Sequence, residues 1–160
     1  MSVYHGSPKK FTIAKPSFTS RVHFNKKKII IDYEGTSLHV TPYKWIGLAY
    51  IGQFPIYKYK GIKHRFRFGV PILSKNNNFK NKIVHIYGKK SLEYSLNKIY
   101  GKGGYLYTFS KSKFIWKKGL GINELISYEE QKPNKIEFIK NPVKEMKKIG
   151  VKFVFVEDKE

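Results

Sequence analysis

The carboxylate of Glu124 lies in a short stretch, in the second half of the chain, whose side chains are expected to alternate between two faces. Residues 123–128 have the sequence Asn-Glu-Leu-Ile-Ser-Tyr, which is predicted to form a β-strand. Successive side chains of a strand point to opposite faces, so Glu124, Ile126 and Tyr128 share one face. A carboxylate on an otherwise apolar face is costly unless it is paired or used in chemistry. Glu124 is therefore either a satisfied structural residue or a candidate catalytic residue.

A second short motif, Tyr-His-Gly-Ser, occupies residues 4–7. Residues 2–5 are predicted to form an opening strand, and Gly6 ends it where the backbone can approach a ligand closely. A His-Gly-Ser tripeptide alone indicates little, because short motifs often occur by chance. The motif gains weight only from its combination with the stretch around Glu124.

The two motifs together resemble the ADP-ribosyltransferase superfamily, specifically its His-Tyr-Glu branch of diphtheria-toxin-like and poly(ADP-ribose)-polymerase-like catalytic domains. Residues 38–42, Leu-His-Val-Thr-Pro, are similar to the passage from a strand into a helix in the same family. The resemblance thus touches three short stretches in the family's order. It implies an α+β fold with split antiparallel β-sheets and few short helices, and it implies NAD as the substrate.

The resemblance also implies a role for each matching residue near the ribose groups of NAD. Glu124 would bind the nicotinamide ribose and stabilise the oxocarbenium-like state through which nicotinamide leaves. His5 would hydrogen-bond the adenine-side ribose. The Gly6 backbone would hold the carboxamide, and Ser7 would support the ribose.

Three further positions would surround the nicotinamide ring. By the same resemblance, Tyr50 and His39 would flank the ring and Gly47 would lie beside its amide. His39 departs from the family, in which an aromatic residue usually stands at this position, and Tyr43 is a weaker substitute. The implied catalytic residues are therefore His5, Tyr50 and Glu124.

Charge is the compositional outlier of this chain. Its 32 Lys and Arg against 11 Asp and Glu give a net charge of +21, and the 58 residues between Glu34 and Glu93 hold eleven cations and no acid. This excess predicts a polyanionic partner, although AT-biased coding and ordinary solvated lysines are alternative explanations. We expect contact with nucleic acid, DNA or RNA, through a basic surface that includes Lys26, Lys27, Lys28, Lys58, Lys60, Arg65, Arg67, Lys117 and Lys118.

Length and composition narrow the class of protein further. The chain of 160 residues, 16% of them aromatic, fits a single domain at residues 1–160, with no room for the helical regulatory domain of the polymerases. Cys is absent, and the five His residues lack metal-site spacing, so we expect neither disulfides nor a metal site. No apolar run approaches the roughly 18 residues of a membrane span. We expect an intracellular, cytoplasmic monomer that does not contact a membrane.

The helices and strands around the motifs are predicted from hydrophobic periodicity and from the positions of Gly, Pro and capping residues. Thr41 and Pro42 are a suitable N-cap and first residue for a helix that ends near Gly52 and buries Trp45, Leu48 and Ala49. Residues 11–25 are predicted to be irregular, and residues 57–60 and 65–68 to form a hairpin around Gly61. Strands are expected at 29–33, 36–40, 83–87, 105–109, 135–139 and 151–156, with helices at 92–100 and 142–149. We expect the buried strand 29–33 to be separate from 36–40, and 135–139 to pair with the Glu124 strand.

Two alternatives remain open. A basic nucleic-acid-binding module on a degenerate transferase fold would bind without turnover, and Glu124 would then be structural. A relative of the tRNA 2′-phosphotransferases would use basic residues around a phosphate and would not depend on a Glu at this position. The Asn-Glu-Leu-Ile stretch argues against the latter. The resemblance therefore implies an NAD-dependent mono-ADP-ribosyltransferase, and the charge leads us to expect that it acts on nucleic acid or on a nucleic-acid-associated protein.

Overall fold

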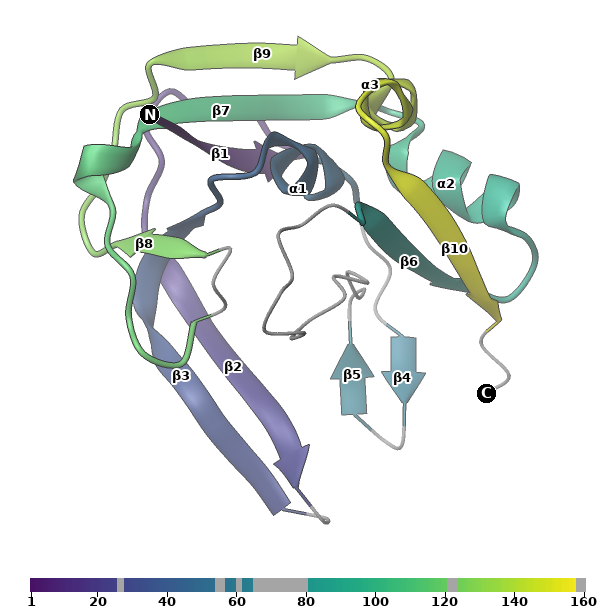
Figure 1. Ribbon diagram of the computed structural model, residues 1–160, viewed down its shortest axis with the longest axis horizontal. Helices are drawn as coiled ribbons and strands as arrows, with labels where there is room; N and C mark the ends of the chain where they lie inside the picture. Colours follow the sequence, from purple (N-terminus) through teal and green to yellow (C-terminus); the bar gives the residue numbers. More distant parts are fainter. Residues whose placement is uncertain (26–27, 54–56, 60–61, 65–80, 121–123, 158–160) are drawn as a thin grey trace.

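The computed structural model describes residues 1–25, 28–53, 57–59, 62–64, 81–120 and 124–157, which form small, mainly antiparallel sheets with few short helices (Figure 1). This arrangement confirms the prediction of an α+β fold. One antiparallel sheet has the order β1-β7-β9, from β1 (Ser2–Ser7), β7 (Gly104–Ser110) and β9 (Lys135–Ile139). The other has the order β2-β3-β8, from β2 (Ser17–Asn25), β3 (Lys28–Val40) and β8 (Leu125–Ser127).

A β-bridge connects these two sheets. The Tyr4 N–H donates to the Thr41 carbonyl at 2.7 Å, and the Thr41 N–H donates to the Tyr4 carbonyl at 2.9 Å. The bridge therefore brings the C-terminal end of β3 to the middle of β1. It places His5 beside His39, although they are far apart in the sequence.

The same bridge explains why helix α1 (Lys44–Ala49) begins later than predicted. Thr41 is held in the bridge, so it is not the N-cap, and Tyr43 takes that position. The Thr41 hydroxyl instead accepts the Tyr43 N–H at 3.1 Å. The expected burial of Trp45, Leu48 and Ala49 is confirmed.

The main core lies between α1 and the C-terminal elements. Helix α2 (Leu92–Tyr100) is capped by the Ser91 hydroxyl, and helix α3 (Pro142–Lys148) is capped by the Asn141 side chain, with Pro in its first turn. Both helices are as predicted to within a residue. Their buried faces meet α1 in a cluster that includes Trp45, Ile46, Leu48, Ile51, Leu96, Ile99, Tyr100, Leu106 and Met146.

Strands β6 (Ile83–Gly88) and β10 (Lys152–Glu157) pair in parallel, which differs from a fold made of antiparallel sheets alone. The chain leaves β6 into α2 and enters β10 from α3. A parallel pair needs such a long connection, because a tight turn can join antiparallel strands only.

A long hairpin of β2 and β3 extends from the body of the molecule (Figure 1). The prediction that residues 11–25 are irregular is therefore wrong for Ser17–Asn25. The two strands expected at 29–33 and 36–40 are one strand of 13 residues, because Gly35 remains paired, opposite Thr19. Of the supposedly buried strand 29–33, Tyr33 is buried whereas Ile30 and Ile31 are exposed.

Strand β8 is shorter than expected, and its partner is different. Glu124 lies directly before it, and Leu125 pairs with Val40 of β3. The predicted pairing of 135–139 with this strand is wrong, since β9 pairs with β7. Tyr128 lies past the end of β8 and is exposed, whereas Ile126 is fully buried.

The aromatic hairpin is confirmed in part. Strands β4 (Tyr57–Tyr59) and β5 (Ile62–His64) pair in antiparallel fashion, while the expected second arm at 65–68 lies outside the described residues. Within the part of the chain that the structure describes, no helix combines the length and apolarity needed to cross a bilayer.

Candidate functional site

A cavity of about 630 Å³ lies where β1, the end of β3 and α1 meet. It is lined by residues that include His5, Gly6, His39, Tyr50 and Glu124. The structure thus brings together five of the seven predicted site residues from both halves of the chain. Ser7 and Gly47 are not among the described residues that line it. A wider groove of about 1,390 Å³ between α2 and α3 contains none of the seven among its described lining residues.

One wall of the cavity is the loop after β1, and Tyr107 of β7 fixes this loop. The Phe11 N–H donates to the Tyr107 hydroxyl at 2.8 Å, and that hydroxyl donates to the Lys9 carbonyl at 2.8 Å. The rings of Phe11 and Tyr107 stack with centroids 3.9 Å apart and planes at 4°. The sequence predicted Tyr107 only as a strand residue, and nothing local in it indicates this long-range support.

His5 is held by the backbone of β3. Its Nδ1–H donates to the His39 carbonyl at 2.8 Å, and because a carbonyl only accepts, Nδ1 must carry the hydrogen. Burial lowers the pKa of His5, and the hydrogen bond to His39 opposes this effect only in part. The ring is therefore neutral at pH 7, and its Nε2 is an acceptor.

This lowered pKa makes stability depend on pH. Below about pH 6.5 the unfolded chain binds a proton at His5 and the folded chain does not, so acid favours unfolding. His5→Asn retains a donor near the Nδ1 position and removes the titration. Between pH 7.5 and 5.5 the wild type is expected to lose stability relative to this variant, by at most about 1.4 kcal/mol per pH unit.

Thermal unfolding of both proteins across this pH range provides the measurement. The two proteins differ only at residue 5, so the difference between the curves reports the contribution of the His5 side chain. Parallel curves would show that His5 is not held neutral in the folded state.

Gly6 and Gly47 lie against each other where β1 packs on α1. A Cβ on Gly6 would collide with the Gly47 carbonyl oxygen and lie 2.8 Å from the Ile51 nitrogen. A Cβ on Gly47 would lie 2.8 Å from the Tyr4 Cβ. Both glycines are thus required by the close approach of strand and helix. The role of Gly47 beside the nicotinamide amide stays a prediction.

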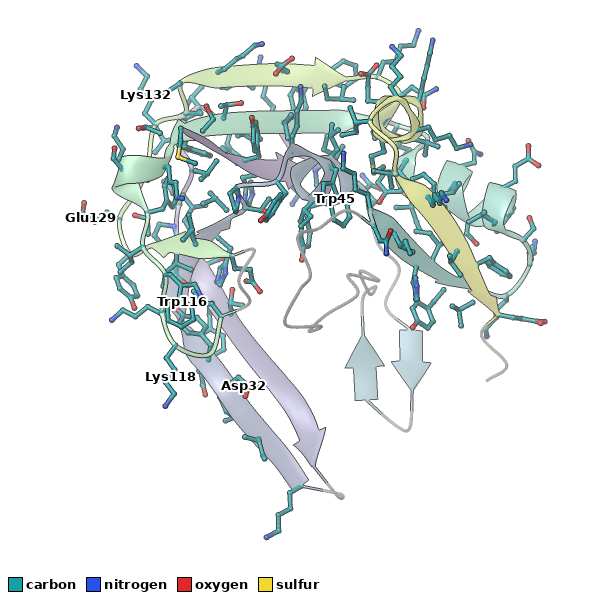
Figure 2. The ribbon with its side chains drawn as sticks, in the orientation of Figure 1. Asp32, Trp45, Trp116, Lys118, Glu129 and Lys132 are labelled. Carbon is teal, nitrogen blue, oxygen red and sulfur yellow. The ribbon has the colours of Figure 1, made fainter. Side chains whose placement is uncertain are left out.

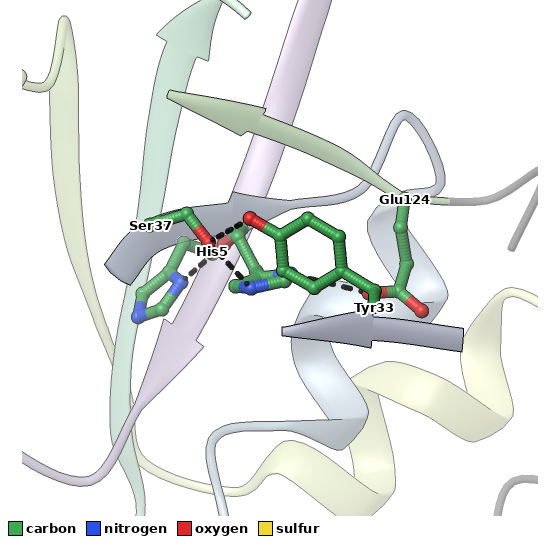
Figure 3. Close-up of polar contacts among 5 residues, drawn as sticks. His5, Tyr33, Ser37 and Glu124 are labelled. Carbon is green, nitrogen blue, oxygen red and sulfur yellow. Dashed lines mark hydrogen bonds and ion pairs between the residues drawn. The ribbon is translucent and has the colours of Figure 1, made fainter. Parts of the chain in front are cut away.

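Glu124 and His39 are in hydrogen-bond contact at the cavity. His39 Nδ1 and Glu124 Oε2 are 3.2 Å apart, with side chains 17% and 22% exposed. On the other side of the ring, His39 Nε2 lies 3.0 Å from the Ser37 hydroxyl, which lies 2.8 Å from the Tyr33 hydroxyl. Figure 3 shows this continuous chain of polar contacts from Tyr33 to Glu124, with His5 beside it.

The sequence prediction missed Ser37 and Tyr33. Both lie on the same face of β3 as His39, because residues two and four apart share a face of a strand. That alternation was available in the sequence. The missing information was that 29–40 is one unbroken strand, since a break at Gly35 would separate Tyr33 from the others.

Tyr50 follows α1 as its C-cap residue, lines the cavity and is 40% exposed. Its backbone N–H donates to the Ile46 carbonyl at 3.1 Å, which fixes the position of the residue. Of the two tryptophans, Trp45 of α1 lies within the core, whereas Trp116 lies on the outside of the molecule (Figure 2).

The predicted basic surface is described in part. Lys28, Lys117 and Lys118 are exposed, and Lys117 Nζ lies 5.7 Å from the centroid of the Tyr128 ring. The side chain of Lys58 is not described. Outside the described residues lie Lys26, Lys27, Lys60, Arg65 and Arg67.

Comparison with protein-family models, with curated proteins and with solved structures gave no match for this chain. Its fold and site define it as an α+β protein with mainly antiparallel sheets and a cavity between two of them. That cavity contains a neutral histidine and a His–Glu pair.

Proposed function

We propose that this protein is an NAD-dependent ADP-ribosyltransferase of the His-Tyr-Glu type, with the split antiparallel sheets of that superfamily. It transfers a single ADP-ribose to nucleic acid or to a nucleic-acid-associated protein. The observation that carries the proposal is that His5, Tyr50 and Glu124 line the same cavity. They are the three residues to which the resemblance of the sequence assigns the catalytic roles.

The cavity suits the donor substrate in size and in hydrogen bonding. Its volume of about 630 Å³ is within the roughly 300–1,000 Å³ that is common for cofactor sites. Because Nδ1–H of His5 is used by the His39 carbonyl, Nε2 is the acceptor that a ribose hydroxyl requires. The Gly6 backbone lies beside it on the cavity wall.

The proposed reaction begins when the bond between the nicotinamide nitrogen and the ribose carbon breaks. Nicotinamide leaves with the bonding electrons, and the ribose carbon becomes cationic. The Glu124 carboxylate stabilises this developing charge, an effect that requires a fixed anion close to the ribose. A nucleophile on the acceptor then bonds to the ribose carbon and loses its proton to solvent.

The acceptor is inferred from charge. A net charge of +21 favours a polyanion, because each neutralised phosphate releases bound counterions. Lys117 and Lys118 are exposed in the segment that leads to Glu124, where an acceptor would enter.

Release of nicotinamide from NAD, measured with and without added DNA or RNA, tests the proposal. Tyr50→Ala is expected to weaken NAD binding by roughly two- to tenfold, the loss of about 0.5–1.5 kcal/mol from an aromatic contact. Tyr94→Ala is the matched control, because Tyr94 is a tyrosine of similar exposure, 46% against 40% for Tyr50, and lies in α2, away from this cavity.

Nicotinamide release that increases with one nucleic acid would support both the chemistry and the acceptor. No release under any condition, together with salt-dependent nucleic-acid binding, would contradict the proposal. The protein would then be the binding module that is the alternative interpretation of the sequence.

A further inference from the structure

Both ring nitrogens of His39 have a polar partner. Nδ1 faces the Glu124 carboxylate at 3.2 Å and Nε2 faces the Ser37 hydroxyl at 3.0 Å. The Tyr33 ring meets it edge-on, with centroids 5.8 Å apart and planes at 86°. The ring is thus fixed by three contacts from the protein, a feature of side chains that orient another group.

The chemistry of the partners sets the direction of these hydrogen bonds. An ionised carboxylate only accepts, so Nδ1 of His39 carries the hydrogen. In the neutral ring Nε2 then accepts from the Ser37 hydroxyl, which in turn accepts from the Tyr33 hydroxyl. In this series of hydrogen bonds, each donor therefore faces the next residue in the direction of Glu124.

The order Ser37, His39, Glu124 is also that of a hydrolase triad, but burial opposes that interpretation. Ser37 is 1% exposed, and its hydroxyl is engaged by both Tyr33 and His39. A nucleophile must reach the substrate, so the hydroxyl is suited to orienting the imidazole rather than to attack.

We propose that His39 is a positioning residue that holds the Glu124 carboxylate at the cavity, and that Ser37 and Tyr33 fix the His39 ring for this task. This inference rests on the proposed function, in which Glu124 is the reactive carboxylate. It gives His39 a role different from flanking the nicotinamide ring, and it adds two residues to the site.

Substitution of His39 by Asn or by Gln distinguishes a role in positioning Glu124 from a role in flanking the nicotinamide ring. The nitrogen of Asn at this position lies near the place of Nδ1, whereas that of Gln lies near Nε2. In NAD cleavage, His39→Gln and His39→Phe are expected to lower kcat by about 10–100-fold with little change in KM, as for other orienting groups. His39→Asn is expected to lose about tenfold less. The opposite order, with Phe more active than Asn, would show that stacking is the role of His39.

A measurement that does not depend on NAD cleavage tests the role of His39 independently of the proposed function. The ¹⁵N NMR shifts of the His39 ring report which nitrogen carries the hydrogen. We expect the Nδ1–H form in the wild type and a shifted Nε2 signal in Ser37→Ala. Tyr33→Phe, which retains the ring and its shape, is expected to change the same signal less.

An Nε2–H form in the wild type would overturn the positioning role whether or not NAD is cleaved. The Nδ1–H form in a protein that cleaves no NAD would leave the hydrogen-bond chain in place and refute the reaction instead.

Discussion

Glu124→Gln is expected to lower the release of nicotinamide from NAD by about 10²–10³-fold, the usual effect of removing one electrostatic group from a transition state. Gln has nearly the same shape, and its amide oxygen can still accept the Nδ1–H of His39, which lies 3.2 Å from Glu124 Oε2. The substitution therefore removes the negative charge and leaves the hydrogen-bond chain in place. In the proposed reaction that charge acts on the developing cation, so kcat should fall and KM for NAD should change little.

Glu129→Gln is the control for this experiment. Glu129 is an exposed carboxylate on the same segment, and it lies on the outside of the molecule (Figure 2). Its replacement changes the net charge by the same amount and should leave turnover unchanged. Equal turnover by the Glu124→Gln variant and the wild type would mean that Glu124 is structural.

Gly6→Ala is expected to have the largest effect on the fold. The added Cβ would collide with the backbone of α1 at the Gly47 carbonyl, and backbone cannot move aside as a flexible side chain can. Overpacking of this kind costs about 1–3 kcal/mol and sometimes more. Displacement of α1 from β1 would also move Tyr50 relative to His5, so NAD binding should weaken together with stability. Denaturant unfolding and NAD titration measure the two effects.

Gly150→Ala separates steric collision from backbone strain. Gly150 has φ of +90°, and a Cβ there would meet nothing within 4 Å. Its replacement should cost only the roughly 1–2 kcal/mol of a side chain in left-handed conformation, without loss of NAD binding. If Gly6→Ala bound NAD as tightly as Gly150→Ala does, the contact of β1 with α1 would not determine the cavity.

Local patterns were sufficient to predict elements whose ends carry their own signals. Helix α2 has Ser91 as a cap and α3 has Pro142 in its first turn, and neither signal depends on distant residues. Helix α1 was misplaced because Thr41 is used by a bridge to Tyr4, a residue far away in the sequence.

The main errors of the sequence prediction concern which strands pair. Strand pairing also depends on residues that are far apart in the sequence. Residues 17–25 alternate in the sequence, with Phe18, Val22 and Phe24 in one set of alternate positions and polar residues in the other, and they form β2 by pairing along β3; the prediction passed over this alternation. The choice of β7 rather than β8 as the neighbour of β9 is likewise decided by the packing of whole sheets.

The candidate site was predictable where a motif defined it. His5, Gly6 and Glu124 belong to two short runs that gain weight only in combination, and all three line the cavity. Ser37 and Tyr33 are ordinary strand residues until β3 is known to be continuous. Their contribution is visible only as distances, 2.8 Å between their hydroxyls and 3.0 Å from Ser37 to His39.

The residues that line the cavity are synthesised in a fixed order, because the ribosome makes the chain from its N-terminus. Among the described residues that line the cavity, all except Glu124 lie between Tyr4 and Tyr50. The wall that would receive NAD is therefore synthesised first, and the carboxylate joins it only after β7, which pairs with β1 and supports the loop at Phe11. A nascent chain thus contains most of the lining residues before it contains Glu124, so the cavity gains its carboxylate only late in synthesis.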